Sequence, residues 1–201
     1  MKTYKDIPIF PLKSIILPGG QFPLRIFERR YLDMTRDCLK NNNGFIIALT
    51  KRDSDYISSV YDYASYVEIV DWSQLDGGLL GITVEGKQIV KLSNCNLDEC
   101  NLLKGDAEEV EYGVDYLVPQ KYQILSKFYK KIYPEIKAYI FHIKPKYNDA
   151  NWLGFRLIEC LPIELNDKAD LISMQEPLDR LERILHICLL YTSDAADDGL
   201  C

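Results

Sequence analysis

The chain has 201 residues, a hydrophobic fraction of 47% and a net charge of −6. This length suits one compact domain or two small ones, and the hydrophobic fraction is ordinary for a soluble chain that can bury a core. No apolar run approaches the roughly 20 residues that cross a bilayer, and the first residues, MKTYKDIP, have no signal-peptide character. The charge balance gives no long-range attraction to nucleic acid or anionic lipid. We therefore expect a cytoplasmic protein with no membrane partner, and nucleic acid is not an expected partner.

The N-terminal segment combines strand, turn and helix patterns in a fixed order. Ile7–Phe10 and Ile15–Leu17 are short apolar runs that predict strands. Pro18-Gly19-Gly20 then predicts a turn, because proline fixes φ and glycine permits positive φ. Phe22–Phe27 alternates apolar and polar residues and predicts a half-buried strand. Apolar residues next recur at helical spacing, which predicts an amphipathic helix over about residues 29–42.

Strand-length apolar runs continue to about residue 112, separated by clusters of Gly, Asn and Asp. They predict five further strands: Phe45–Leu49, Ala64–Trp72, Leu79–Glu85, Gln88–Asn94 and Asp106–Glu111. Asp76-Gly77-Gly78 is typical of a hairpin turn. Many short strands that close on themselves indicate a small β barrel over residues 1–115.

From Val118 onward the apolar period becomes helical and predicts a bundle over residues 116–187. The expected helices cover Tyr122–Ile132, Trp152–Leu161 and Asp167–Met174. Pro177 suits the first turn of a last helix. The fold class is therefore α+β, with a small β pseudo-barrel followed by a helical bundle subdomain.

The last segment, residues 188–201, is a short acidic tail that contains alanine and glycine and has no apolar period. The run from Cys188 to Asp197 also resembles the translation of a transposon-end sequencing adaptor. We expect residues 188–201 to be non-native; the alternative is a frayed natural C-terminus. Without the three aspartates of this segment, the net charge is about −3.

The sequence lacks the common patterns of nucleotide and nucleophile sites. It holds no GxxxxGK[ST] phosphate loop and no GxSxG nucleophile turn. His142 and His186 have no second ligand at metal-binding spacing, and Cys95 and Cys100 have no partner pair. We therefore expect no catalytic residue, no cofactor and no metal.

Aromatic residues cluster between positions 56 and 72, with aspartates between them. Tyrosine and tryptophan offer a large contact area with a polar group, as surfaces that bind polypeptides often do. The candidate polypeptide contacts are Tyr56, Tyr61, Tyr63 and Trp72. In the alternative interpretation, the alternation of the strand makes Tyr61, Tyr63 and Tyr66 cover the end of the barrel. The aspartates argue against a nucleic-acid stacking surface, which needs basic neighbours.

Five segments carry a family resemblance through their order and spacing. They are IPIFPLKSIILPGGQFPLRIFERRY (residues 7–31), GFIIAL (44–49), DGGLLGITVEG (76–86), LIECLP (157–162) and LDRLER (178–183). Together they resemble the LON substrate-binding domain, which opens ATP-dependent Lon proteases and also occurs alone in small bacterial proteins. The form PLRIFERRY is more similar to the stand-alone members.

The resemblance implies a PUA-like pseudo-barrel and a non-catalytic module that binds exposed or unfolded polypeptide segments in bacterial protein quality control. A separate ATPase or protease is a further candidate partner. The family motif positions, expected to be structural, are Pro18, Gly19, Gly20, Phe22, Pro23, Leu24, Phe27, Glu28 and Tyr31. Of these, Phe22, Leu24 and Phe27 are expected in the core. Two alternatives stay open: the N-terminal part of a truncated ATP-dependent Lon protease, and a PUA-like RNA-binding module.

Overall fold

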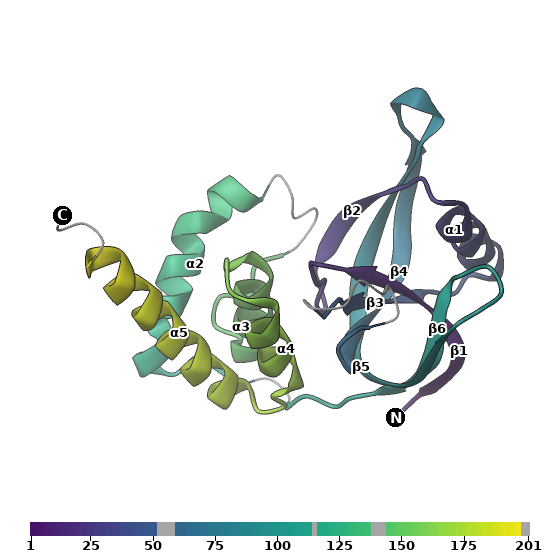
Figure 1. The fold of residues 1–201 in the computed structure, drawn as a ribbon. Helices are drawn as coiled ribbons and strands as arrows, with labels where there is room; N and C mark the ends of the chain where they lie inside the picture. The colour runs from purple at the N-terminus through teal and green to yellow at the C-terminus, as the bar shows by residue number, and fades with distance from the viewer. Residues whose placement is uncertain (52–58, 114–115, 138–143, 198–201) are drawn as a thin grey trace.

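In the computed structural model, the chain forms a β lobe and a helical lobe that lie side by side (Figure 1). The structure describes residues 1–51, 59–113, 116–137 and 144–197, with side chains up to residue 189. The β lobe contains β1 (Thr3–Leu12), β2 (Gln21–Ile26), α1 (Arg29–Asn41), β3 (Phe45–Leu49), β4 (Tyr63–Gln74), β5 (Leu80–Leu97) and β6 (Leu103–Glu109). The helical lobe contains α2 (Gln123–Ile136), α3 (Ala150–Cys160), α4 (Leu165–Ser173) and α5 (Pro177–Asp197).

The sheet closes into a small barrel. Its strand order is β2-β5-β4-β3-β1-β6, and β6 also pairs with β5, so five strands form a ring with β2 outside it. The β1–β3 pair is parallel, whereas the other pairs are antiparallel. Pro23 is tolerated because β2 is the outermost strand, where a missing N–H need not break the ladder. The predicted α+β fold class is confirmed.

Two strand predictions were wrong: Ile15–Leu17 is not a strand, and the strands predicted on either side of Gly86 are one strand, β5. Both differences arise where the loop Ile15–Leu17 approaches Gly86. Ile15–Leu17 is a buried loop, because its apolar side chains enter the core while its backbone turns back, with the Gly20 N–H donating to the Leu17 carbonyl at 2.8 Å. The expected break near Gly86 is absent, and β5 runs through it. A Cβ at Gly86 would lie 2.4 Å from the Leu17 carbonyl oxygen. Gly86 therefore marks the close approach of this loop and does not end a strand.

The prediction that Phe27 builds core was also wrong. Side chains alternate along β2, so Leu24 and Ile26 point inward and are buried, whereas Phe27 falls on the opposite phase. Its exposed fraction is 69%. Phe22 is half-buried against the core, and Tyr31 is buried on α1.

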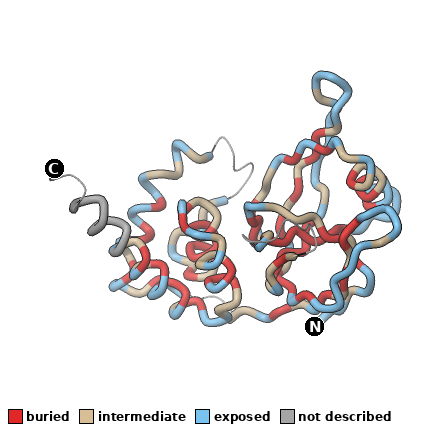
Figure 2. The backbone as a smooth tube through the Cα atoms, viewed as in Figure 1, coloured by how far each residue is buried: buried red, intermediate tan, exposed pale blue. Residues whose placement is uncertain are grey.

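One continuous core joins the two lobes. The larger apolar cluster includes residues of the barrel, such as Val84, and residues of α3 and α5, such as Leu157 and Ile184. A smaller cluster fills the rest of the barrel around Ile9 and Leu103. Figure 2 shows this buried interior running through both lobes. The lobes are therefore expected to unfold together.

The predicted helices are present, with small shifts at their ends. Pro134, expected to break the chain, lies inside the last turn of α2. The backbone of α5 continues through Cys188 to Asp197. That residues 188–201 are non-native stays a prediction. Among the described helices, none combines the length and apolar character needed to cross a membrane.

Candidate functional site

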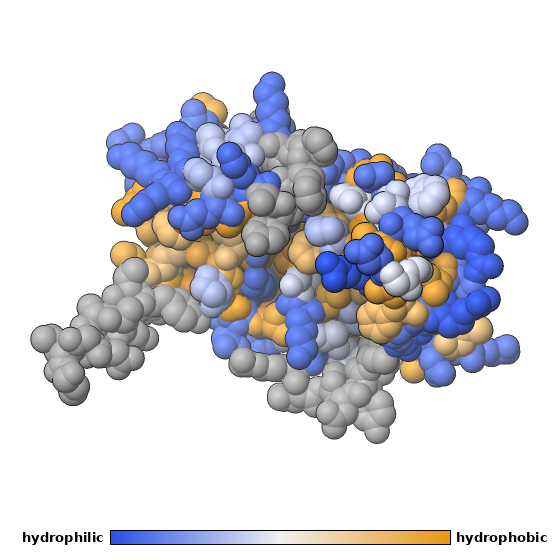
Figure 3. Space-filling view, turned by 90° about the horizontal axis from the view of Figure 1, so that it is seen from above, coloured by the Kyte–Doolittle hydropathy of each residue, from blue (hydrophilic) through white to orange (hydrophobic). Residues whose placement is uncertain are grey.

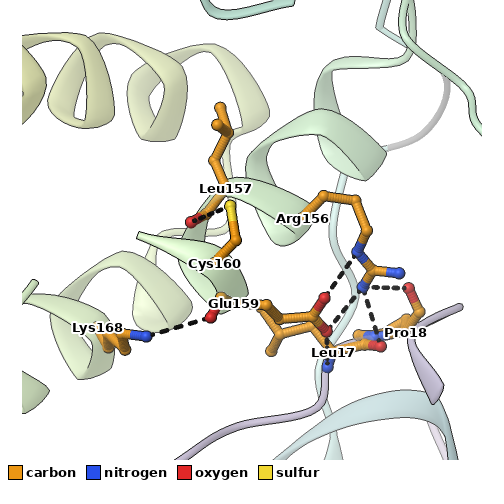
Figure 4. A network of polar contacts seen from close by, with 7 residues as sticks. All are labelled: Leu17, Pro18, Arg156, Leu157, Glu159, Cys160 and Lys168. Atoms are coloured by element: carbon orange, nitrogen blue, oxygen red, sulfur yellow. Dashed lines mark hydrogen bonds and ion pairs between the residues drawn. The ribbon is translucent and has the colours of Figure 1, made fainter. Parts of the chain in front are cut away.

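The Pro-Gly-Gly turn of the family motif forms a joint between the two lobes, shown in Figure 4. The Arg156 side chain on α3 is fully buried, and its Nη2 donates to the carbonyls of Leu17 at 3.1 Å and Pro18 at 3.2 Å. The Leu17 N–H donates to Glu159 Oε1 at 2.7 Å. Arg156 Nε and Glu159 Oε2 form an ion pair at 2.9 Å. The turn and α3 are therefore held by a buried charge pair with backbone partners on the other lobe.

Glycines permit this close packing. A Cβ at Gly20 would lie 2.5 Å from Glu159 Oε1. Gly19 has φ +79°, which side chains disfavour. Its N–H donates to the Gly86 carbonyl at 2.8 Å, and the Gly86 N–H donates to the Gly20 carbonyl at 2.9 Å. We call Leu17–Gly20, Gly86, Arg156 and Glu159 the interlobe joint.

The chemistry of the joint is structural. Burial raises the pKa of Glu159, while the charge of Arg156 and the Leu17 N–H oppose that rise. Burial likewise raises the pKa of the neighbouring Cys160 thiol to about 12. A thiol that stays protonated is a poor nucleophile. The joint therefore fixes the two lobes and offers no reactive group.

A free strand edge lies on the hairpin that projects from the barrel (Figure 1). Within β4, the residues that pair with β3 are Ser65–Val67. Beyond that point, Glu68–Gln74 pairs with β5 and with no other described strand. We call Glu68–Gln74 the arm edge. Unpaired N–H and C=O groups on such an edge can accept another strand.

The outward backbone groups of the arm edge can be assigned. The Leu75 N–H donates to the Leu79 carbonyl at 2.8 Å. Because bonded and non-bonded pairs alternate in an antiparallel ladder, the N–H and C=O groups of Trp72 and Gln74 point away from β5. Asp71 Oδ1 accepts a hydrogen bond from the outward Trp72 N–H at 2.9 Å. One outward donor is therefore covered by a side chain, whereas no backbone group of the described residues bonds to the outward groups of Gln74.

Exposed apolar side chains accompany this edge. Trp72 has an exposed fraction of 61%, and Val70 is also exposed. The last β2–β5 pair is Ile26 with Leu80. Phe27 follows Ile26 and Leu79 precedes Leu80, so these two exposed side chains lie at the same end of the sheet. Figure 2 shows that the projecting hairpin tip is mostly exposed. The hairpin thus combines open backbone groups with apolar contact area.

The sequence-predicted contacts do not converge on one surface. Tyr56 lies outside the described residues. Tyr61 is half-buried, and its hydroxyl donates to Asn166 Oδ1 on α4. Tyr63 is half-buried against the core. Tyr63 and Trp72 are nine residues apart on β4. At about 3.3 Å per residue, the distance between them along the strand is about 30 Å.

Of the predicted contacts that the structure describes, Trp72 is the most exposed. Sequence reasoning missed the free edge itself, because strand pairing decides it. The exposed pair Val70 and Trp72, two residues apart, was the available signal. In the part of the chain that the structure describes, no three His, Cys, Asp or Glu side chains gather as a metal site would need.

Comparisons with solved structures agree with this architecture. A crystal structure of a Lon N-terminal domain protein from Xanthomonas campestris is 26% identical, with a TM-score of 0.75 over 92% of this chain and 98% of that chain. The N-terminal domain of a Lon protease from the Mycobacterium avium complex has a TM-score of 0.62 at 16% identity, over 92% of this chain and 97% of that chain. At that identity the second likeness concerns the fold alone.

Sequence comparisons with known proteins identify the family to which this chain belongs. Lon protease 3 of Sorangium cellulosum is 24% identical over 194 residues, which are 90% of this chain and 23% of that protein. The Lon protease of Endomicrobium trichonymphae is 23% identical over 190 residues, 90% of this chain and 24% of that protein. The chain thus spans about a quarter of the length of the curated relatives it matches. The family model of the ATP-dependent protease La (LON) substrate-binding domain matches residues 6–188. The chain belongs to the LON substrate-binding domain family.

Proposed function

We propose that this chain is a non-catalytic cytoplasmic module that binds exposed or unfolded polypeptide segments. The observation that carries the proposal is the match of residues 6–188 to a family of substrate-binding domains. The arm edge supports it with a surface of suitable chemistry. An extended client segment adds there as a further strand, beside Trp72.

Strand addition suits clients of many sequences, because backbone groups make the contacts. Trp72 and Gln74 together offer about four outward groups, of which the Trp72 N–H is already bonded to Asp71, so about three contribute about 1 kcal/mol each. About 3 kcal/mol corresponds to binding weaker than millimolar. The apolar contact with Trp72 and Val70 is therefore needed for micromolar affinity. Asp71 keeps the Trp72 N–H satisfied until a client carbonyl replaces it.

Association with a separate ATPase or protease is also a proposal. Its support is that the matched relatives are Lon proteases and that this chain corresponds to about a quarter of their length. RNA binding has no comparable support, because the arm edge contains the acidic residues Glu68 and Asp71 and no basic residue.

Proline substitution tests strand addition directly. The Gln74 N–H points outward, so Gln74→Pro removes an edge donor without breaking a bond to β5, and Gln74→Ala is the matched control. We expect Gln74→Pro to weaken binding of a fluorescein-labelled, permanently unfolded polypeptide by about 3- to 10-fold, as the loss of one hydrogen bond requires. We expect Trp72→Ala to weaken binding by about 10-fold. Fluorescence anisotropy measures both.

A second control separates binding from stability. Tyr61→Ala removes a half-buried side chain, so it should lower the melting temperature and leave the affinity of folded molecules unchanged. Absence of binding by the unmodified chain would refute the proposed function. Equal binding by Gln74→Pro and Gln74→Ala would refute strand addition at the arm edge and leave polypeptide binding itself in place.

A further inference from the structure

The helical lobe carries an apolar groove between α2, α5 and the connection from α3 to α4. Its volume is about 340 Å³. The lining includes Ile124 and Phe128 of α2, Leu161 and Ile163 of the connection, and Leu185 and Ile187 of α5. Figure 3 shows hydrophobic side chains gathered on this lobe, at the left of the view. The groove is separate from the arm edge, which lies on the other lobe.

The apolar side chains of α2 that line the groove are exposed to solvent, whereas side chains that pack in a core are buried. Ile124 and Phe128 stand one helical turn apart and have exposed fractions of 59% and 39%. Leu125 and Tyr129, one position further along α2, are buried in the core. The helix therefore buries one face inside the lobe and presents a second apolar line to the groove.

Exposed lysines border this apolar line. Lys127 and Lys131 each stand three residues after a groove residue and lie one turn apart on α2. Within the described part of the chain, neither forms an ion pair. Lys121, two residues before the start of α2, is already paired with Glu182 at 2.9 Å. Two exposed lysines without an ion pair among the described residues therefore stand beside the apolar line of α2 and form a basic edge there.

We infer that the groove binds an amphipathic helix of a partner polypeptide, with apolar side chains in the groove and carboxylates one turn apart facing Lys127 and Lys131. This inference rests on the proposed function and deepens it by naming a second class of client. An apolar groove with charge on one rim fits a helix with an apolar face and an acidic flank. A second copy that docked α2 against α2 would bring two basic edges together.

Two matched peptides test the charge preference. Both are helical and carry leucines at spacings of three and four residues; one has glutamates on the flank and the other has lysines there. We expect the full 201-residue chain to bind the glutamate peptide at least 10-fold more tightly, measured by fluorescence anisotropy. The variant Lys127→Glu/Lys131→Glu should reverse this preference, because only the sign of the rim has changed.

A second variant tests the groove. Ile124→Ser/Phe128→Ser alters two exposed side chains, so the fold is preserved, and it should weaken the glutamate peptide at least 10-fold. Equal affinity for the two peptides, or no effect of this variant, would overturn the inference. A concentration-dependent dimer that this variant abolishes would assign the groove to a second copy and would also overturn it.

The same samples separate this inference from the proposed function. Binding of the unfolded polypeptide depends on the arm edge, so the groove variant should retain it. If the unfolded polypeptide binds and neither helical peptide does, the groove inference fails alone. If no probe binds, the proposed function fails with it.

Discussion

Breaking the charge pair of the interlobe joint should destabilise the whole molecule. Glu159→Gln keeps the size of the side chain and an acceptor for the Leu17 N–H, but it removes the charge opposite Arg156. The Arg156 side chain is 0% exposed and that of Glu159 is 14% exposed, so solvent does not replace the lost partner. An uncompensated buried charge costs about 3–5 kcal/mol. For a chain of this size, that corresponds to a melting temperature lower by about 6–20 °C.

A double variant distinguishes this cause from general damage to the core. Arg156→Met/Glu159→Leu removes both charges and leaves mainly the Leu17 N–H and the Pro18 carbonyl without partners, because the Gly20 N–H still donates to the Leu17 carbonyl. We expect it to cost about 1–3 kcal/mol, less than Arg156→Met or Glu159→Leu alone. Urea unfolding followed by circular dichroism and tryptophan emission gives the free energy of unfolding of each variant. A Glu159→Gln variant within about 1 kcal/mol of the original chain, or costs that simply add, would refute the reasoning.

Two further predictions concern the barrel. Lys5, Asn94 and the Asp6 N–H hold the pKa of Asp106 at about 2, below its ordinary value of 3.8. The stability that this carboxylate contributes is complete above about pH 4 and is lost as the pH falls toward 2. Asp106→Asn should therefore flatten the change of the urea midpoint over that range. Gly86→Ala should cost about 1–3 kcal/mol, because the new Cβ would lie 2.4 Å from the Leu17 carbonyl oxygen, whereas Lys87→Ala, exposed and adjacent, should change the urea midpoint little.

Local patterns predicted the elements that depend on local chemistry. The helix over about 29–42 and the strand Phe45–Leu49 were found almost residue for residue, because their periods reflect a single buried face. The hairpin turn at Asp76-Gly77-Gly78 was found where the glycines require positive φ. Ile15–Leu17 failed because an apolar run shows burial but does not show whether the backbone has a ladder partner.

The candidate surfaces depend on tertiary pairing, which a single sequence does not display. Trp72 was a candidate by residue type, yet its exposure follows from the short pairing of β3 with Ser65–Val67. Ile124 and Phe128 fit a helical stripe as well as any core residues would. Only the arrangement of α2 and α5 shows that this stripe lines an open groove.

The interlobe joint connects these surfaces physically. The arm edge lies on one lobe and the groove on the other, so a client that occupies both must match a spacing that the joint holds constant. Two modest sites on one rigid body can bind a matching client about 10²- to 10⁴-fold more tightly than either site alone. That gain in affinity requires a fixed spacing between the two sites. If the lobes were flexible, each binding event would have to order them, and the lost conformational entropy would reduce the gain. If both proposed sites bind one client, the buried pair of Arg156 and Glu159 would affect affinity without touching that client, because it would determine whether the second site is within reach once the first is filled.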